Sequence, residues 1–148
     1  MELTKREISN IHLAMTLSKE AGKLSKAKRS KVGAVIISNE EGFYVGVNGT
    51  LPGHDNCCEY EYEGKLVTKD EVIHAEENAL DKMHREGVVA KGCISVQSLS
   101  PCIKCFTRMR NIGIRFIVYQ EAYRNTDHLT GYEDMVMSYD KFCEKYGH

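Results

Sequence analysis

The chain has 148 residues, which is the size of one domain, and 42% of them are hydrophobic, which suits an ordinary globular core. The net charge of −1 excludes a strongly basic nucleic-acid-coating protein. No stretch reaches the roughly 20 apolar residues of a membrane span. Because the amino terminus lacks an apolar signal core, we expect a cytoplasmic protein whose 6 cysteines are thiols or metal ligands.

The first third of the chain predicts a helix and then a β-hairpin. Thr4 and Glu7 have the spacing of a capping box, and apolar residues recur at helical spacing until Gly22. A basic loop follows. Residues 32–38 form a continuous β-branched run typical of a buried strand, and residues 43–48 read as the returning strand. These two strands predict an antiparallel pair.

The rest of the chain predicts helices that alternate with strands. Residues 49–70 form a long polar stretch without a clear period, and a loop of this length is usually functional. The elements predicted after it are a helix at 73–86, a strand at 93–99, a helix at 102–111, a strand at 115–120 and a helix at 132–146. Parallel crossovers added to one hairpin give an α/β fold, with a mixed sheet covered by helices. We expect one domain over 1–148.

Four residues indicate a metal-dependent active site: His74, Glu76, Cys102 and Cys105. Cys102 and Cys105 lie three residues apart at a predicted helix start, so both sulfurs face one side, and a helix amino terminus favours thiolates. His74 begins another predicted helix and supplies a nitrogen. Three protein ligands leave a zinc ion one open position, which is the pattern of catalytic sites.

Glu76 follows His74 by two residues, so its side chain is expected beside the metal rather than on it. A carboxylate there can take a proton from a metal-bound water and return it to a ring nitrogen. The pattern H-x-E with P-C-x-x-C is the signature of the zinc nucleobase deaminases. Two other interpretations stay open at this point. The three ligands are ordinary core residues, or they belong to a closed structural zinc site in a non-catalytic interaction module, which has no need of Glu76.

Several segments resemble the cytidine deaminase superfamily and, more narrowly, the deoxycytidylate (dCMP) deaminases of bacteriophages. They are KVGAVI at 31–36, NGTLPG at 48–53, NCCEY at 56–60, HAEENAL at 74–80, SLSPCIKC at 98–105 and GIRFIVYQEAYRN at 113–125. The resemblance implies a three-layer α-β-α fold with a five-stranded sheet, whose fifth strand is expected near Met135 or at the carboxyl-terminal edge.

The resemblance also implies an activity: zinc-dependent hydrolysis of dCMP to dUMP and ammonia, supplying dUMP for thymidylate synthesis. His74, Cys102 and Cys105 map onto the zinc ligands, and Glu76 maps onto the proton shuttle. Family members are commonly hexamers that dCTP activates and dTTP inhibits. The family's effector turn is Gly-Tyr-Asn-Gly, and here Val47 replaces the aromatic residue, which leaves effector control open.

The candidate substrate contacts come from separate segments of the chain, and they are Arg29, Lys31, Asn48, Ala75, Ser100 and Tyr123. A guanidinium grips phosphate oxygens with two hydrogen bonds, so Arg29 is the first candidate for the phosphate and Lys31 the second. The amide of Asn48 is expected at the sugar. Backbone groups of Ala75 and Ser100 are expected at the base, and Tyr123 resembles the tyrosine that lines the family's nucleotide pocket.

Two further alternatives remain. A second, structural zinc would use His54, Cys57 and Cys58, although the cysteine that the family places before its VGAVI strand is absent here. The chain is alternatively another zinc deaminase, acting on cytidine, on guanine or on adenosine in tRNA. A tRNA enzyme needs a basic face, and the net charge of −1 argues against it.

Overall fold

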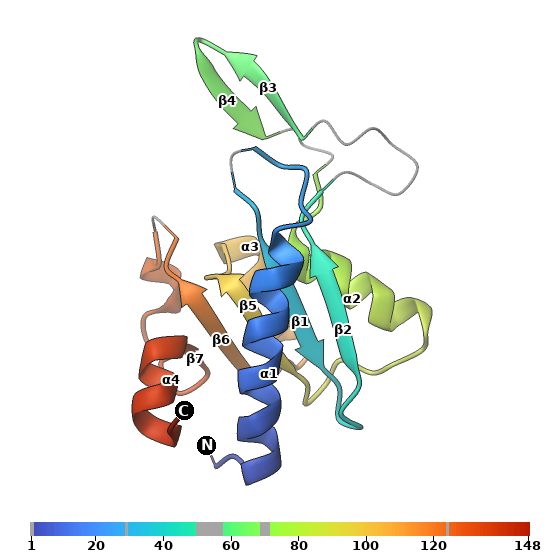
Figure 1. Ribbon diagram of the computed structural model, residues 1–148, viewed down its shortest axis with the longest axis vertical. Coiled ribbons are helices and arrows are strands. Elements are labelled where there is room, and N and C mark those ends of the chain that lie inside the picture. The colour runs from blue at the N-terminus through green and yellow to red at the C-terminus, as the bar shows by residue number, and fades with distance from the viewer. Residues whose placement is uncertain (1, 29, 50–57, 69–71, 124) are drawn as a thin grey trace.

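A mixed five-stranded sheet is the centre of the molecule. The computed structural model describes residues 2–28, 30–49, 58–68, 72–123 and 125–148. The strands of the sheet lie in the order β2-β1-β5-β6-β7 (Figure 1). Their bounds are β1 Gly33–Ile37, β2 Phe43–Val47, β5 Ile94–Leu99, β6 Phe116–Glu121 and β7 Val136–Ser138. Strand β1 pairs antiparallel with both β2 and β5, whereas β5, β6 and β7 run parallel to one another.

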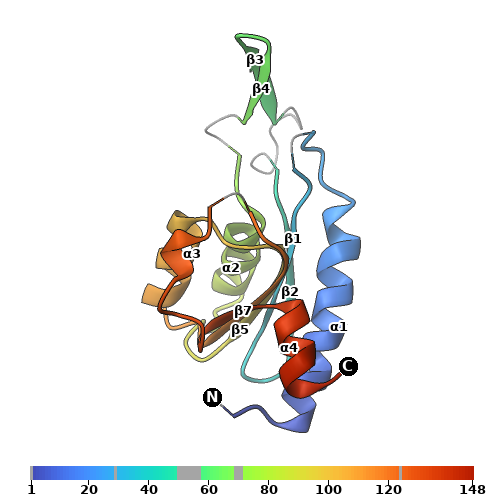
Figure 2. The ribbon, with the colours of Figure 1, turned by 90° about the vertical axis from the view of Figure 1, so that its left-hand side faces the viewer.

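Helices cover both faces of this sheet and make the three-layer fold that was predicted. Helices α1 (Lys5–Gly22) and α4 (Tyr139–Tyr146) lie on one face, and α2 (Ala75–Arg85) and α3 (Ile103–Asn111) lie on the other (Figure 2). Each face has its own apolar cluster, one around Phe116 and the other around Met109. None of the described helices combines the length and the apolar character that crossing a membrane requires.

The first helix and the first hairpin follow their sequence signals. Thr4 Oγ1 accepts a hydrogen bond from the Glu7 backbone N–H (3.1 Å), and Glu7 Oε1 accepts one from the Thr4 N–H (2.9 Å), so the predicted capping box is confirmed. All five residues of β1 are buried, because the strand is central and helices cover both of its sides. The continuous apolar run therefore predicted both the strand and its burial.

The prediction of one helix over 132–146 was wrong in its first half. The chain first adds β7 beside β6, with the Ile117 N–H donating to the Met135 carbonyl (2.8 Å), and helix α4 begins only after Ser138. Ser138 Oγ accepts from the Lys141 N–H, as an N-cap does. The fifth strand expected near Met135 is thus confirmed.

A second, two-stranded sheet lies within the polar stretch for which no element was predicted. Strand β3 (Glu59–Tyr62) pairs antiparallel with β4 (Lys65–Thr68), and the hairpin projects beyond the main body (Figure 1). The two turn residues, Glu63 and Gly64, have φ of 51° and 76°, which is the conformation of a tight two-residue hairpin turn. A 3-10 turn at Asp127–Leu129 completes the described elements.

Candidate zinc centre and substrate cavity

The starts of α2 and α3 bring His74, Cys102 and Cys105 together. His74 is the N-cap of α2, Cys102 is the N-cap of α3, and Cys105 lies in the first turn of α3. The Nδ1 atom of His74 lies 3.2 Å from Cys105 Sγ and 3.6 Å from Cys102 Sγ. The ligand atoms of the three residues lie within 4.8 Å of one another, so one metal ion can reach all three.

Local structure fixes where these three side chains lie. Gly49 and Ile73 exchange backbone hydrogen bonds of 3.1 and 2.7 Å, which places the start of α2 beside the end of β2. At the start of α3, Cys102 Sγ accepts from the Cys105 backbone N–H (3.4 Å), so a sulfur takes the place that a serine or aspartate oxygen has in other helices. Both helices thus begin at the ligand group, and their partial positive charge favours anionic sulfur.

The hydrogen bonds of this group shift the pKa values of the two thiols in opposite directions. A hydrogen bond from the Cys105 thiol lowers the pKa of Cys102 to about 3, and His74 acts in the same direction. The same hydrogen bond, together with burial, raises the pKa of Cys105 far above its ordinary value. The bond to Cys102 raises the pKa of His74 against the effect of burial.

This donor set fits zinc. One imidazole nitrogen and two cysteine sulfurs are ligands of the kind that zinc prefers, and three protein ligands leave a position for water. The lowered pKa of Cys102 favours its thiolate form, and zinc binding requires a thiolate at Cys105 and an unprotonated ligating nitrogen at His74.

Glu76 lies beside this group and is 5% exposed. Burial raises the pKa of its carboxyl, and the amide of Gln97 donates a hydrogen bond of 3.1 Å to Oε2. A buried carboxyl with a raised pKa, next to a metal-ligand group, is suited to taking up and returning a proton.

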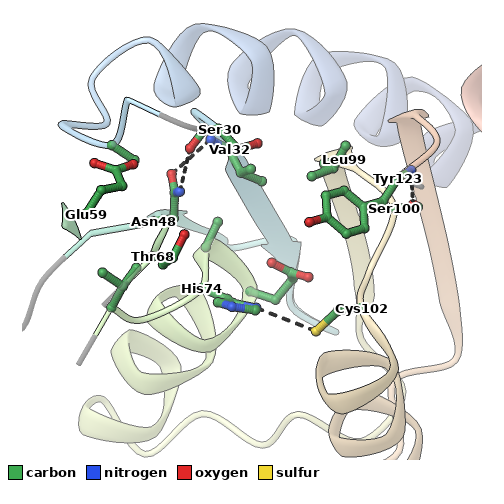
Figure 3. A pocket seen from close by; sticks show the side chains of 14 residues that line it. Ser30, Val32, Asn48, Glu59, Thr68, His74, Leu99, Ser100, Cys102 and Tyr123 are labelled. Atoms are coloured by element: carbon green, nitrogen blue, oxygen red, sulfur yellow. Dashed lines mark hydrogen bonds between the residues drawn. The ribbon is translucent and has the colours of Figure 1, made fainter. Parts of the chain in front are cut away.

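A cavity opens in front of these residues (Figure 3). Its wall comes from six separate segments, and the lining residues are Ala27, Ser30, Val32, Asn48, Glu59, Thr68, Val72, His74, Ala75, Glu76, Leu99, Ser100, Cys102 and Tyr123. Figure 3 shows His74 and Cys102 facing each other at one end, with Asn48 and Tyr123 on separate sides. The candidate metal group therefore lies at one end of a cavity whose wall has both polar and apolar side chains.

Four of the six predicted substrate residues line this cavity: Asn48, Ala75, Ser100 and Tyr123. Lys31 is exposed and is not among the lining residues, so the structure does not bring it to the site. Arg29 lies outside the described residues, as do His54 and Cys57 of the expected second zinc site. Cys58 is described and is buried.

Two of the lining residues also shape the cavity. Asn48 accepts from the Val32 N–H (2.9 Å) and donates to the Ser30 carbonyl (2.7 Å), so its amide holds the loop that follows α1 against the end of β2. Ser100 Oγ accepts from the Tyr123 N–H (2.7 Å), so it ties the segment after β6 to the segment after β5. These two segments meet because the carboxyl ends of parallel strands share one edge of the sheet.

Sequence reasoning missed several residues of the site, and Glu59, Thr68 and Gln97 are three of them. Glu59 and Thr68 reach the cavity from the β3–β4 hairpin, whose signal is the alternation of polar and apolar residues around Glu63 and Gly64. Gln97 lies behind Glu76, and its signal is a long polar side chain inside a buried strand.

A mixed sheet, a His/Cys/Cys group at two helix starts and a buried glutamate beside it define the class of zinc-dependent deaminases. The family model described as the cytidine and deoxycytidylate deaminase zinc-binding region matches residues 8–121. The chain therefore belongs to this family, and zinc is its cofactor.

Similar proteins include deoxycytidylate deaminases of fungal and phage origin. The one from Schizosaccharomyces pombe is 30% identical over 77% of this chain, which spans only 38% of that longer protein. The one from Enterobacteria phage T4 is 29% identical over 76% of this chain and 76% of that protein. The dCMP deaminase of the cyanophage S-TIM5, whose crystal structure is a complex with dCMP and dUMP, is 33% identical to this chain in sequence. The two structures match with a TM-score of 0.78 over 92% of this chain and 99% of the cyanophage chain.

Proposed function

We propose that the protein is a zinc-dependent enzyme that hydrolyses dCMP to dUMP and ammonia. The observation that carries the proposal is the convergence of His74, Cys102 and Cys105 beside the buried carboxyl of Glu76, at the end of one cavity. The similar cyanophage protein, which has bound dCMP and dUMP in its crystal structure, supports the choice of substrate.

In this proposal His74, Cys102 and Cys105 hold the zinc ion. When bound, zinc lowers the pKa of a coordinated water and so provides hydroxide near neutral pH. Glu76 would take one proton from the attacking water and deliver it to the ring nitrogen N3, while the water oxygen forms a bond to C4. The second proton of the water would pass to the amino nitrogen as its bond to C4 breaks, so that one dCMP and one water give one dUMP and one ammonia.

The remaining walls of the cavity orient the nucleotide. Backbone groups of Ala75 and Ser100 are proposed to contact the base, Asn48 the sugar, and Tyr123 the side of the nucleotide. All four line the same cavity as His74. Each Asn48 polar atom has one backbone partner and keeps capacity for one more, since an amide offers two donors and two acceptor lone pairs.

Arg29 is proposed to bind the phosphate. Its support is position in the chain, because Ala27 and Ser30 both line the cavity. Arg29→Ala is expected to raise KM for dCMP more than KM for deoxycytidine, since only dCMP has the phosphate. Lys31→Ala removes the same charge two residues away, from a side chain outside the cavity lining, and is expected to change both KM values less. Equal effects of Arg29→Ala on the two substrates would refute the assignment.

Ammonia release from dCMP, deoxycytidine, guanine and a tRNA tests the substrate. The proposal expects dCMP to have the highest kcat/KM, and equal turnover of deoxycytidine would remove the argument for phosphate recognition. Glu76→Gln is expected to keep one zinc per chain and lose turnover. Glu144→Gln, at an exposed position on α4, serves as the matched control and is expected to keep both. Turnover that persists in Glu76→Gln would contradict the proton-shuttle role.

We further propose that the protein is a homohexamer in the cytoplasm and that its activity responds to dCTP and dTTP. The support for this part of the proposal is the resemblance of the chain to dCMP deaminases. Val47, at the end of β2, stands where the family's effector turn has an aromatic residue. Size-exclusion chromatography and ammonia-release rates, each with and without dCTP and dTTP, test this part. A monomer whose rate is indifferent to both nucleotides would contradict it.

A further inference from the structure

Two polar side chains are completely buried on the face of β5 that is turned toward α2. Ser95 and Gln97 are both 0% exposed, although the strand is otherwise mostly apolar. Their neighbours Ile94 and Val96 point to the opposite face, into the cluster that also contains Phe116. A buried amide is costly unless it is hydrogen-bonded, so the partners of Gln97 indicate what it does.

Every polar atom of Gln97 has a partner. Its Oε1 accepts a hydrogen bond from the Ser95 hydroxyl at 3.0 Å. Its Nε2 donates to the Leu99 carbonyl at 2.8 Å and to Glu76 Oε2 at 3.1 Å. Ser95 and the Leu99 carbonyl together fix which way the amide lies, because a carbonyl oxygen only accepts. The amide nitrogen is thereby turned toward the carboxyl of Glu76.

We propose that Gln97 is a positioning residue for the proton transfer by Glu76. Its amide holds Oε2 as a hydrogen-bond acceptor, so Oε1 is the oxygen that takes the proton and returns it. Ser95 affects Glu76 only indirectly, because its hydroxyl fixes the orientation of the Gln97 amide. This inference rests on the proposed deaminase function.

An amide suits this place better than a charged or acidic group. It donates to the carboxyl without adding a charge to a buried site, and it does not ionise near neutral pH. The Gln97 amide then keeps Oε2 of Glu76 in place and leaves Oε1 without this hydrogen bond. Catalytic groups need such support, since a carboxylate that rotates about its last bond loses its alignment with the substrate.

The main test replaces Gln97 by methionine, which has a similar length and no amide. Gln97→Met is expected to lower kcat for dCMP by about 10- to 100-fold, the range for losing one hydrogen bond to a charged group. KM for dCMP and the content of one zinc per chain are expected to stay unchanged. Val96→Ala, a change in the same strand on its opposite face, is the control for a purely structural effect. It is expected to lower Tm and to keep kcat per folded chain.

Double variants test whether the three residues act in series. Ser95→Ala is expected to lower kcat by about 3- to 10-fold, the effect of one neutral hydrogen bond. Combined with Gln97→Met it should cause no further loss, because Ser95 acts only through the amide. If Gln97→Met fails to fold, Ser95→Ala alone carries the test. An unchanged kcat in the folded variants, or independent losses in the double variant, would overturn the proposal.

The side-chain amide of Gln97 provides a readout that does not depend on turnover. In a nitrogen–proton NMR correlation spectrum, both Nε2 protons are expected to exchange slowly with solvent. The resonance is assigned by its absence in Gln97→Met, and Glu76→Ala is expected to shift one of the two protons. Fast exchange of both protons in the wild type would overturn the proposal. Inactivity of the wild-type protein on dCMP would instead count against the proposed function, which separates the two failures.

Discussion

Gly46 controls how closely α2 approaches the sheet, and its replacement by alanine tests whether that approach sets the geometry of the site. A Cβ atom at this position would lie 2.2 Å from the Ala75 carbonyl oxygen and 2.5 Å from the Ala79 nitrogen. Both are backbone atoms of α2, so no side chain can rotate away. Because contacts to a Cβ essentially never fall below 3.0 Å, the start of α2 must move by at least about 0.8 Å.

This displacement acts directly on the candidate site, because Ala75 lies between His74 and Glu76. Overpacking of this kind costs about 1–3 kcal/mol of stability. Misplacement of catalytic groups by about 1 Å costs on the order of 10²-fold in rate. Gly46→Ala is therefore expected to lower Tm and to lower kcat for dCMP by about 10²-fold. Thermal unfolding, zinc content and ammonia release per folded chain measure the three effects.

Gly49→Ala is the matched control. Gly49 lies three residues further along the same segment, and a Cβ there would meet nothing within 4 Å. The Tm of Gly49→Ala and its kcat for dCMP are expected to remain close to those of the wild type. A Gly46→Ala protein with wild-type Tm and kcat would show that α2 moves without consequence, and the reasoning from close approach would be refuted.

Three more predictions concern single groups of the site. Because the pKa of Cys102 is lowered to about 3, its alkylation by iodoacetamide in metal-stripped protein should stay nearly constant from about pH 8 to about pH 5, with Cys102→Ser as the blank. A rate that falls tenfold per pH unit would contradict this. Burial raises the pKa of the Glu76 carboxyl, so the stabilising effect of its protonated form is complete below the ordinary value of 4.5 and is lost as the pH rises through the raised pKa. Metal-stripped Glu76→Gln should thus resist urea better than the wild type at pH 7 but not in acid, and equal stability at both would count against the assignment. Ser100→Ala removes the acceptor of the Tyr123 N–H and should raise KM for dCMP by about 3- to 10-fold in a steady-state assay. An unchanged KM would show that this contact does not shape the cavity.

The sequence predicted the elements whose signals are local. The Thr4–Glu7 capping box, the apolar run of β1 and the helix starts at His74 and Cys102 each depend on a few adjacent residues, and the structure has all of them. Strand β7 has three residues and depends on pairing with β6, so its segment could not be separated from the helix that follows. The β3–β4 hairpin lacks a continuous apolar run, because its strands are mostly exposed.

The same distinction between local and long-range signals applies to the residues of the site. His74, Cys102 and Cys105 were predicted as one group because helix starts and ligand spacing constrain them together, and the structure places them within reach of a single ion. Gln97 escaped notice because its partner Glu76 lies on another element, 21 residues away along the chain. Lys31 was proposed from its charge alone, and sequence does not show which way a loop side chain points.

X-ray absorption at the zinc edge of the purified protein tests the central claim most directly. The account predicts a four-ligand shell that contains two sulfurs, one imidazole nitrogen and one further light atom, and it predicts the loss of one sulfur in Cys105→Ala. A shell of four protein ligands, or a sulfur count that does not change in Cys105→Ala, would contradict it.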